Sequence, residues 1–91
     1  MLVTTQGVEY VGEFREDRKD GFGMLATKNE KVIGTWNEDE IVEGFLIKDK
    51  NTYYGQFKQQ KKHGQGITIW ADQSFYYGGF VNNKKEGKEF L

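Results

Sequence analysis

An aromatic–glycine–aromatic string that returns at regular intervals constrains this chain more than any other feature. It reads "YVGEF" at 10–14, "YYGQF" at 53–57 and "YYGGF" at 76–80, and a weaker form, "VIGTW", stands at 32–36. The central glycines, at positions 12, 34, 55 and 78, are 22, 21 and 23 residues apart. Internal periods of about 20–50 residues are typical of repeat proteins, in which each unit contacts only its neighbours. The sequence therefore predicts four units.

Each string is followed by a polar stretch and a further glycine, at Gly21, Gly44, Gly64 and Gly87. In the first and third units this glycine pairs with a second one, Gly23 or Gly66. Leu46 and Glu89 interrupt the pair in the second and fourth units. Two units are therefore regular and two are degenerate.

The segments between the turn-forming residues are short and rich in aromatic and β-branched side chains, as β-strands are. Helices are poorly supported, because glycine recurs in almost every window and costs about 1 kcal/mol in a helix interior. The sequence predicts an all-β chain of consecutive β-hairpins with about nine strands. Its single domain divides into units at about 8–29, 30–50, 51–73 and 74–91, preceded by a half-unit strand at 2–5.

Alternate side chains of a strand point to opposite faces of the sheet, so Tyr53, Gly55 and Phe57 share one face. The glycine leaves room there for a ring or for the glycines of the partner strand. Rings of successive units are expected to form an aromatic ladder, either as the core or as the lining of a ligand groove. The ladder residues are Tyr10, Phe14, Trp36, Tyr53, Phe57, Tyr76 and Phe80.

The opposite face also carries apolar residues: Val11, Phe22, Met24, Ile33, Phe45, Ile47, Tyr54, Ile67, Ile69 and Tyr77. A single-layer sheet can bury only one face internally, and this strip is larger than a soluble monomer normally exposes. Either it binds a partner or a second copy, or twist and end packing cover it. The predicted contacts are Tyr54, Tyr77, Phe22, Ile67, Ile69 and Met24.

The polar stretches at 15–20, 37–43, 58–63 and 81–86 are expected to be loops along one edge. The last two contain a basic cluster, Lys58, Lys61, Lys62, Lys84 and Lys85. These lysines either contact anionic phospholipid or form an ordinary solvated surface, and the acidic stretch 37–43 interrupts any longer basic stripe. Within that stretch Ile41 and Val42 are either tucked against the second unit or exposed.

Composition narrows the function classes. The chain has no cysteine and one histidine, which removes disulfides and thiolate metal sites and leaves little for imidazole chemistry. His63 has no obvious catalytic partner, so a turn or packing role is expected. Thirteen basic and 14 acidic residues give no general attraction to nucleic acid. The sequence predicts a protein without catalytic residues, metal or cofactor. It also predicts a cytoplasmic location, because no signal sequence or long apolar run is present.

The stretch "YYGQFKQQKKHGQGITIWADQ" at 53–73 resembles a unit of the MORN-repeat family, and the resemblance extends over nearly the whole chain as four units. It implies an elongated, twisted antiparallel sheet of hairpins with a groove along one side. It also implies an adaptor, a self-associating scaffold or a membrane-proximal module, and no catalysis.

The resulting hypothesis is a non-catalytic interaction module or scaffold that binds an extended segment or helix of another protein, or itself. Open sheet ends at 2–5 and 88–91 predict end-to-end association and a homodimer. The alternatives are a membrane-associated module that binds anionic phospholipid, and a small inhibitor that blocks a larger protein.

Overall fold

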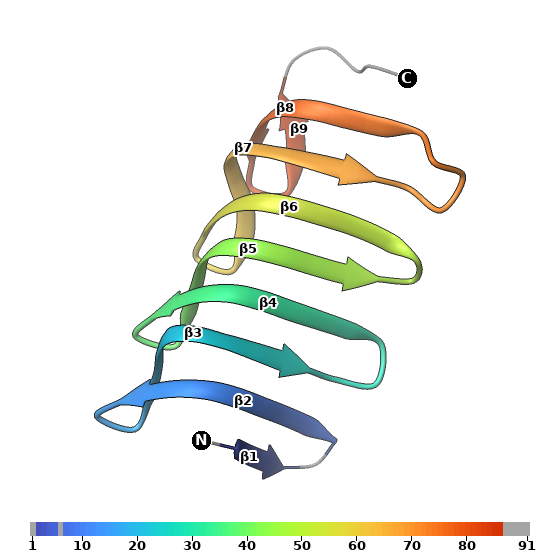
Figure 1. The fold of residues 1–91 in the computed structure, drawn as a ribbon. Coiled ribbons are helices and arrows are strands. Elements are labelled where there is room, and N and C mark those ends of the chain that lie inside the picture. Colours follow the sequence, from blue (N-terminus) through green and yellow to red (C-terminus); the bar gives the residue numbers. More distant parts are fainter. Residues whose placement is uncertain (1, 6, 87–91) are drawn as a thin grey trace.

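The computed structural model describes residues 2–5 and 7–86, which form one antiparallel sheet whose strand order follows the chain (Figure 1). The strands are β1 (Leu2–Thr5), β2 (Val8–Arg15), β3 (Arg18–Ala26), β4 (Glu30–Asn37), β5 (Glu40–Lys48), β6 (Asn51–Lys58), β7 (Lys61–Ile69), β8 (Phe75–Val81) and β9 (Lys84–Glu86). The sheet is elongated, 41 × 23 × 16 Å, and open. The predicted all-β fold of consecutive hairpins is confirmed. The end predicted at 88–91 lies outside the described residues.

The outer end of each hairpin is a two-residue turn in which both residues have positive φ. The turns are Glu16–Asp17, Glu38–Asp39, Gln59–Gln60 and Asn82–Asn83. Such turns match the right-handed twist of the flanking strands. The prediction of six- or seven-residue loops is therefore wrong, because strand pairing continues to the turn, as in Lys58 opposite Lys61. We call these outer ends the hairpin arms (14–19, 36–41, 57–62 and 80–85).

A β-bulge separates each of the first three arms from the main part of its hairpin. The register shifts between Gly12 and Phe14, and again between Gly55 and Phe57. A bulge bends a strand and leaves a residue unpaired. In the third unit the extra residues lie on β7, where His63, Gly64 and Gln65 face Gln56 of β6. The Gln56 side-chain oxygen accepts a hydrogen bond from the Gln65 amide at 2.9 Å. Figure 1 shows the arms turning out of the plane of the longer strand segments.

A row of glycines crosses seven strands, from β2 to β8, each glycine paired with the next: Gly12, Gly23, Gly34, Gly44, Gly55, Gly66 and Gly78. A Cβ atom on Gly55 would lie 2.6 Å from the Gly66 Cα, and one on Gly66 would lie 2.5 Å from a ring carbon of Tyr53. The tyrosine rings thus occupy the space that side chains in this row would need. This explains why glycine stands between the rings.

The tyrosine hydroxyls anchor the rings to backbone beyond the glycine row. The Tyr53 hydroxyl donates to the Gln56 carbonyl at 2.7 Å, and the Tyr10 hydroxyl donates to the Glu13 carbonyl at 3.1 Å. Burial raises the pKa of Tyr53 to about 12, so this hydroxyl remains a donor at neutral pH. Tyr10 and Tyr53 thus each link the aromatic packing of a unit to the backbone at the bulge of the same unit.

Candidate interaction surfaces

The first aromatic set lies in the core rather than in an open groove. Five of its rings are buried: Tyr10, Trp36, Tyr53, Tyr76 and Phe80. The other two, Phe14 and Phe57, are half-buried against them. Tyr53 packs edge-to-face on Phe57 and Phe80, with ring centroids 5.1 and 5.0 Å apart. We call the side of the sheet that carries these rings the core face.

The opposite side, the outer face, carries a continuous apolar row. Its members are paired strand to strand next to the glycine row: Val11, Met24, Ile33, Phe45, Tyr54, Ile67 and Tyr77. Tyr77 is 59 % exposed and Tyr54 is 44 % exposed. The Phe45 and Tyr54 rings contact each other, with centroids 4.6 Å apart. No described residue covers this row.

The structure places all six predicted partner contacts on this outer face. Tyr54, Tyr77, Phe22 and Ile69 are exposed, and Met24 and Ile67 are half-buried. Phe22 is the most exposed large apolar side chain among the described residues, at 64 %. The strip is therefore open to solvent. Neither the twist of the sheet nor the packing of the described residues covers it.

Two shallow hollows lie along the glycine row on the outer face. One, of about 260 Å³, is lined by Phe22, Phe45 and Tyr54, and the other, of about 220 Å³, by Tyr54, Ile67 and Tyr77. Glu43 and Tyr54 line both, so the hollows are neighbours. Apolar side chains form one wall of this groove, and polar side chains form the other: Thr35, Glu43, Gln56 and Gln65.

The lysines of the predicted basic cluster divide into two groups. Lys58, Lys61 and Lys84 are exposed near the hairpin ends. Lys62 is half-buried, with its Nζ 5.4 Å from the ring centroid of Tyr53, and Lys85 is exposed, with its Nζ 5.1 Å from the ring centroid of Trp70. These are cation–π contacts on the core face. Two of the five lysines thus belong to the packing of the arms.

Neighbouring arms are joined through their turns, which brings the basic cluster together. The Lys62 amide donates to the Asn83 side-chain oxygen at 2.9 Å, and the Asn83 amide donates to the Lys62 carbonyl at 3.0 Å. The first two units make the same pair of bonds between Lys19 and Asp39, at 2.7 and 2.9 Å. Lys19 and Lys62 are therefore equivalent positions.

The apolar pair of the second polar stretch is split between core and surface. Ile41 stands opposite Trp36, where the first and third units have Lys19 opposite Phe14 and Lys62 opposite Phe57, and it is buried. Val42 is 43 % exposed. Both alternatives for the pair thus apply, one to each residue.

His63 is half-buried and directly follows the third arm. It lines a shallow hollow with Val42 and Phe57, and its Nδ1 has no hydrogen-bond partner among the described residues. This position agrees with the expected packing role.

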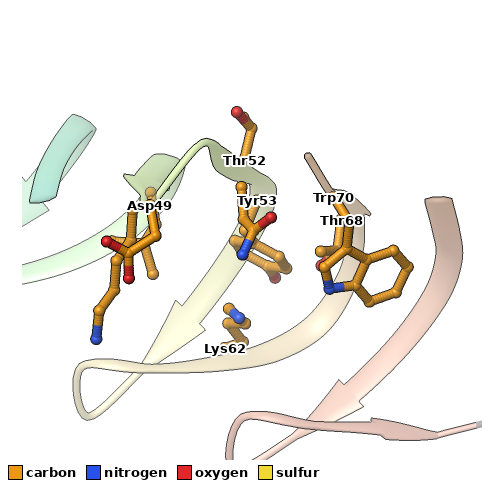
Figure 2. Close-up of a pocket in the computed structure, with 9 residues that line it drawn as sticks. Asp49, Thr52, Tyr53, Lys62, Thr68 and Trp70 are labelled. Carbon is orange, nitrogen blue, oxygen red and sulfur yellow. The ribbon is translucent and has the colours of Figure 1, made fainter. Parts of the chain in front are cut away.

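A cavity on the core face, where the second and third units meet, was not anticipated from the sequence. It has a volume of about 270 Å³, and Lys48, Tyr53, Lys62, Thr68 and Trp70 line it among others (Figure 2). A comparison of units in the correct register would have singled out Thr68. That threonine occupies the core position that Leu25 and Leu46 hold in the first two units.

Comparison with known proteins identifies the repeat. The family model of the MORN repeat matches residues 10–29, 53–75 and 76–88, together more than half of the chain. The unmatched segment between the first two matches contains the degenerate second unit, with Val32 in place of tyrosine and Leu46 in place of the second glycine. No curated protein matches the chain. On the family match, the chain belongs to the MORN-repeat family.

Proposed function

We propose that this chain is a non-catalytic interaction module that binds a segment of another protein on its outer face. MORN repeats are generally modules of protein or membrane interaction without catalysis. The observation that carries the proposal is the apolar row next to the glycine row, in which Tyr54 and Tyr77 are open to solvent. Exposed aromatic side chains beside a hollow are typical anchors of protein interfaces.

The groove favours an extended segment as the occupant. Its two hollows are shallow and continuous, and they cross several strands. Apolar side chains of the segment would contact Phe45, Tyr54 and Tyr77, while basic or amide groups would face Glu43 on the polar wall. A helix of the same polarity is the alternative occupant.

The first test is affinity capture from the native host with the wild-type protein and with the double variant Tyr54→Ser/Tyr77→Ser. We expect the amount of partner captured by the double variant to fall at least about tenfold, because buried aromatic anchors contribute more than about 1 kcal/mol each. Quantitative mass spectrometry of the captured proteins is the measurement.

The matched control is Arg15→Ser/Glu40→Ser, which changes two exposed charged residues of the arms and leaves the outer face intact. The control should capture the same partner as the wild type. Equal capture by all three proteins would contradict the proposal. Loss of dimer mass in Tyr54→Ser/Tyr77→Ser, seen by light scattering, would instead identify a second copy as the occupant.

Binding of anionic phospholipid is the second candidate function, because the fold brings Lys61, Lys62 and Lys84 onto adjoining arms. Vesicles with phosphatidylserine should then bind the protein in low salt and release it in high salt, and Lys61→Glu/Lys84→Glu should abolish the binding. Flotation is the measurement. Binding unchanged by that variant would contradict lipid contact at the arms.

An inhibitor would use the same outer face as an adaptor and would differ only in the effect on its partner. The cytoplasmic location remains a prediction from the sequence.

A further inference from the structure

The contact between the third and fourth units differs on the core face from the contact between the first and second units. In the first unit the Lys19 ammonium has a carboxylate partner, since its Nζ lies 3.7 Å from Asp39 in the turn of the next unit. The equivalent turn residue beside Lys62 is Asn83, which keeps the backbone hydrogen bond but has no charge. No described carboxylate lies within ion-pair distance of Lys62. This lysine thus lacks the counterion that its counterpart has.

A buried hydroxyl marks the same place. Thr68 is 6 % exposed, and its Oγ1 has no hydrogen-bond partner among the described residues. The corresponding core positions hold Leu25 and Leu46, which have no polar atom to satisfy. A buried hydroxyl destabilises a fold unless a ligand or an ordered water satisfies it, and Thr68 adjoins a cavity that has room for either.

Two neighbouring cavities meet at these residues. The cavity of about 270 Å³ and a second one of about 390 Å³ share Lys62, Thr68 and Trp70. Lys48 lines the first cavity, and Lys84 and Lys85 line the second. Figure 2 shows the first cavity with Asp49 at one end and Trp70 at the other.

The charge around the two cavities is positive. Four lysines line them, against Asp49 as the one carboxylate of the described lining residues. Burial lowers the pKa of Lys62, and the nearby charge of Lys48 lowers it further. The remaining walls are apolar and aromatic, from Leu46, Tyr53 and Trp70.

We propose that this place is a binding site for a carboxylate carried on an aromatic or compact apolar group. The carboxylate pairs with the Lys62 ammonium, in the role that Asp39 has beside Lys19, and the apolar group lies between Tyr53 and Trp70. The Thr68 hydroxyl donates to the bound carboxylate after rotation about its Cα–Cβ bond. Such a carboxylate belongs either to a free small molecule or to the C-terminus of a peptide. The site is on the core face and is independent of the proposed outer-face function.

The probes are 3-phenylpropionate and the peptide acetyl-Gly-Gly-Phe with a free carboxylate, each compared with its neutral amide. Titration of the full ¹⁵N-labelled chain should shift the Trp70 indole signal in a saturable way at millimolar concentration. The Trp36 indole provides an internal control, because it donates to the Gly23 carbonyl at 3.0 Å in the other core cluster and should not shift.

Three variants test the chemistry. Lys62→Met should weaken binding at least tenfold, and Asn83→Asp should do the same, because the new carboxylate takes the place of the ligand as Asp39 does in the first unit. Thr68→Leu should weaken binding and raise the unfolding temperature. Lys58→Met changes an exposed lysine that lines neither cavity and should bind as the wild type does.

The outcomes separate clearly. Saturable binding of either acid and not of its amide supports the site, and the acid that binds identifies the source of the carboxylate. Equal binding of the amides, equal binding of inorganic phosphate, full affinity in Asn83→Asp, or no saturable shift with either acid would overturn the proposal.

Discussion

Gly66→Ala is expected to destabilise the protein by about 2–3 kcal/mol. A Cβ atom at this position would lie 2.5 Å from the Tyr53 ring, so the ring must move. The Tyr53 hydroxyl would then lose its hydrogen bond to the Gln56 carbonyl, and the Tyr53 ring would lose its edge-to-face contacts with Phe57 and Phe80. Urea unfolding followed by circular dichroism measures the change.

Gly79→Ala is the matched control for this substitution. Gly79 lies one residue beyond the glycine row, and the nearest atom to an added Cβ is 3.4 Å away, an ordinary contact. Its stability change should stay within about 0.5 kcal/mol of zero. Equal losses for Gly66→Ala and Gly79→Ala would show that the glycine row is not set by close packing under the tyrosines.

Tyr53→Ala should have the largest effect of any single truncation, about 3–5 kcal/mol. Tyr53 is 2 % exposed, and its ring contacts Phe57 within its own unit and Phe80 in the next. Its removal leaves a cavity where two units meet and an unpaired carbonyl at Gln56. Small single domains have about 5–15 kcal/mol of total stability, so we expect a partly unfolded protein by circular dichroism.

The adjacent residue supplies the control, because Tyr54 has the same side chain and points to the outer face. It is 44 % exposed and has one ring contact, to Phe45. Tyr54→Ala should cost about 1 kcal/mol and leave the circular dichroism spectrum unchanged. Similar losses for both tyrosines would mean that the outer face also contributes to the core.

The sequence was sufficient to predict the strands and the two faces of the sheet, because both follow from the alternation of side chains on either side of the glycines. Tyr53 and Tyr54 were assigned to opposite faces on that basis, and their exposures of 2 % and 44 % agree. The arms were missed. The residues at and beside the turns are exposed and as polar as those of a loop. Turns such as Gln59–Gln60 also carry none of the usual glycine signals.

The candidate surfaces were predictable to different degrees. Parity alone places Phe22 and Tyr77 on the outer face, whereas their solvent exposure depends on whether anything packs there. The core-face cavity is lined from three strands, β5, β6 and β7, and by Trp70 just after β7, so the spacing within a single unit does not predict it. Lys62 was singled out for its charge, but its position over the Tyr53 ring depends on the bend of the arm.

The glycine-on-glycine register from β2 to β8 has a consequence for the evolution of such chains. Every unit meets the next through the same pairing, and substantial contacts link only strands adjacent in the chain. A whole hairpin can therefore be inserted or deleted without a change in the joints on either side. The length of the array is thus free to vary by duplication, while a pocket such as the one beside Thr68 arises from a few substitutions around a single unit.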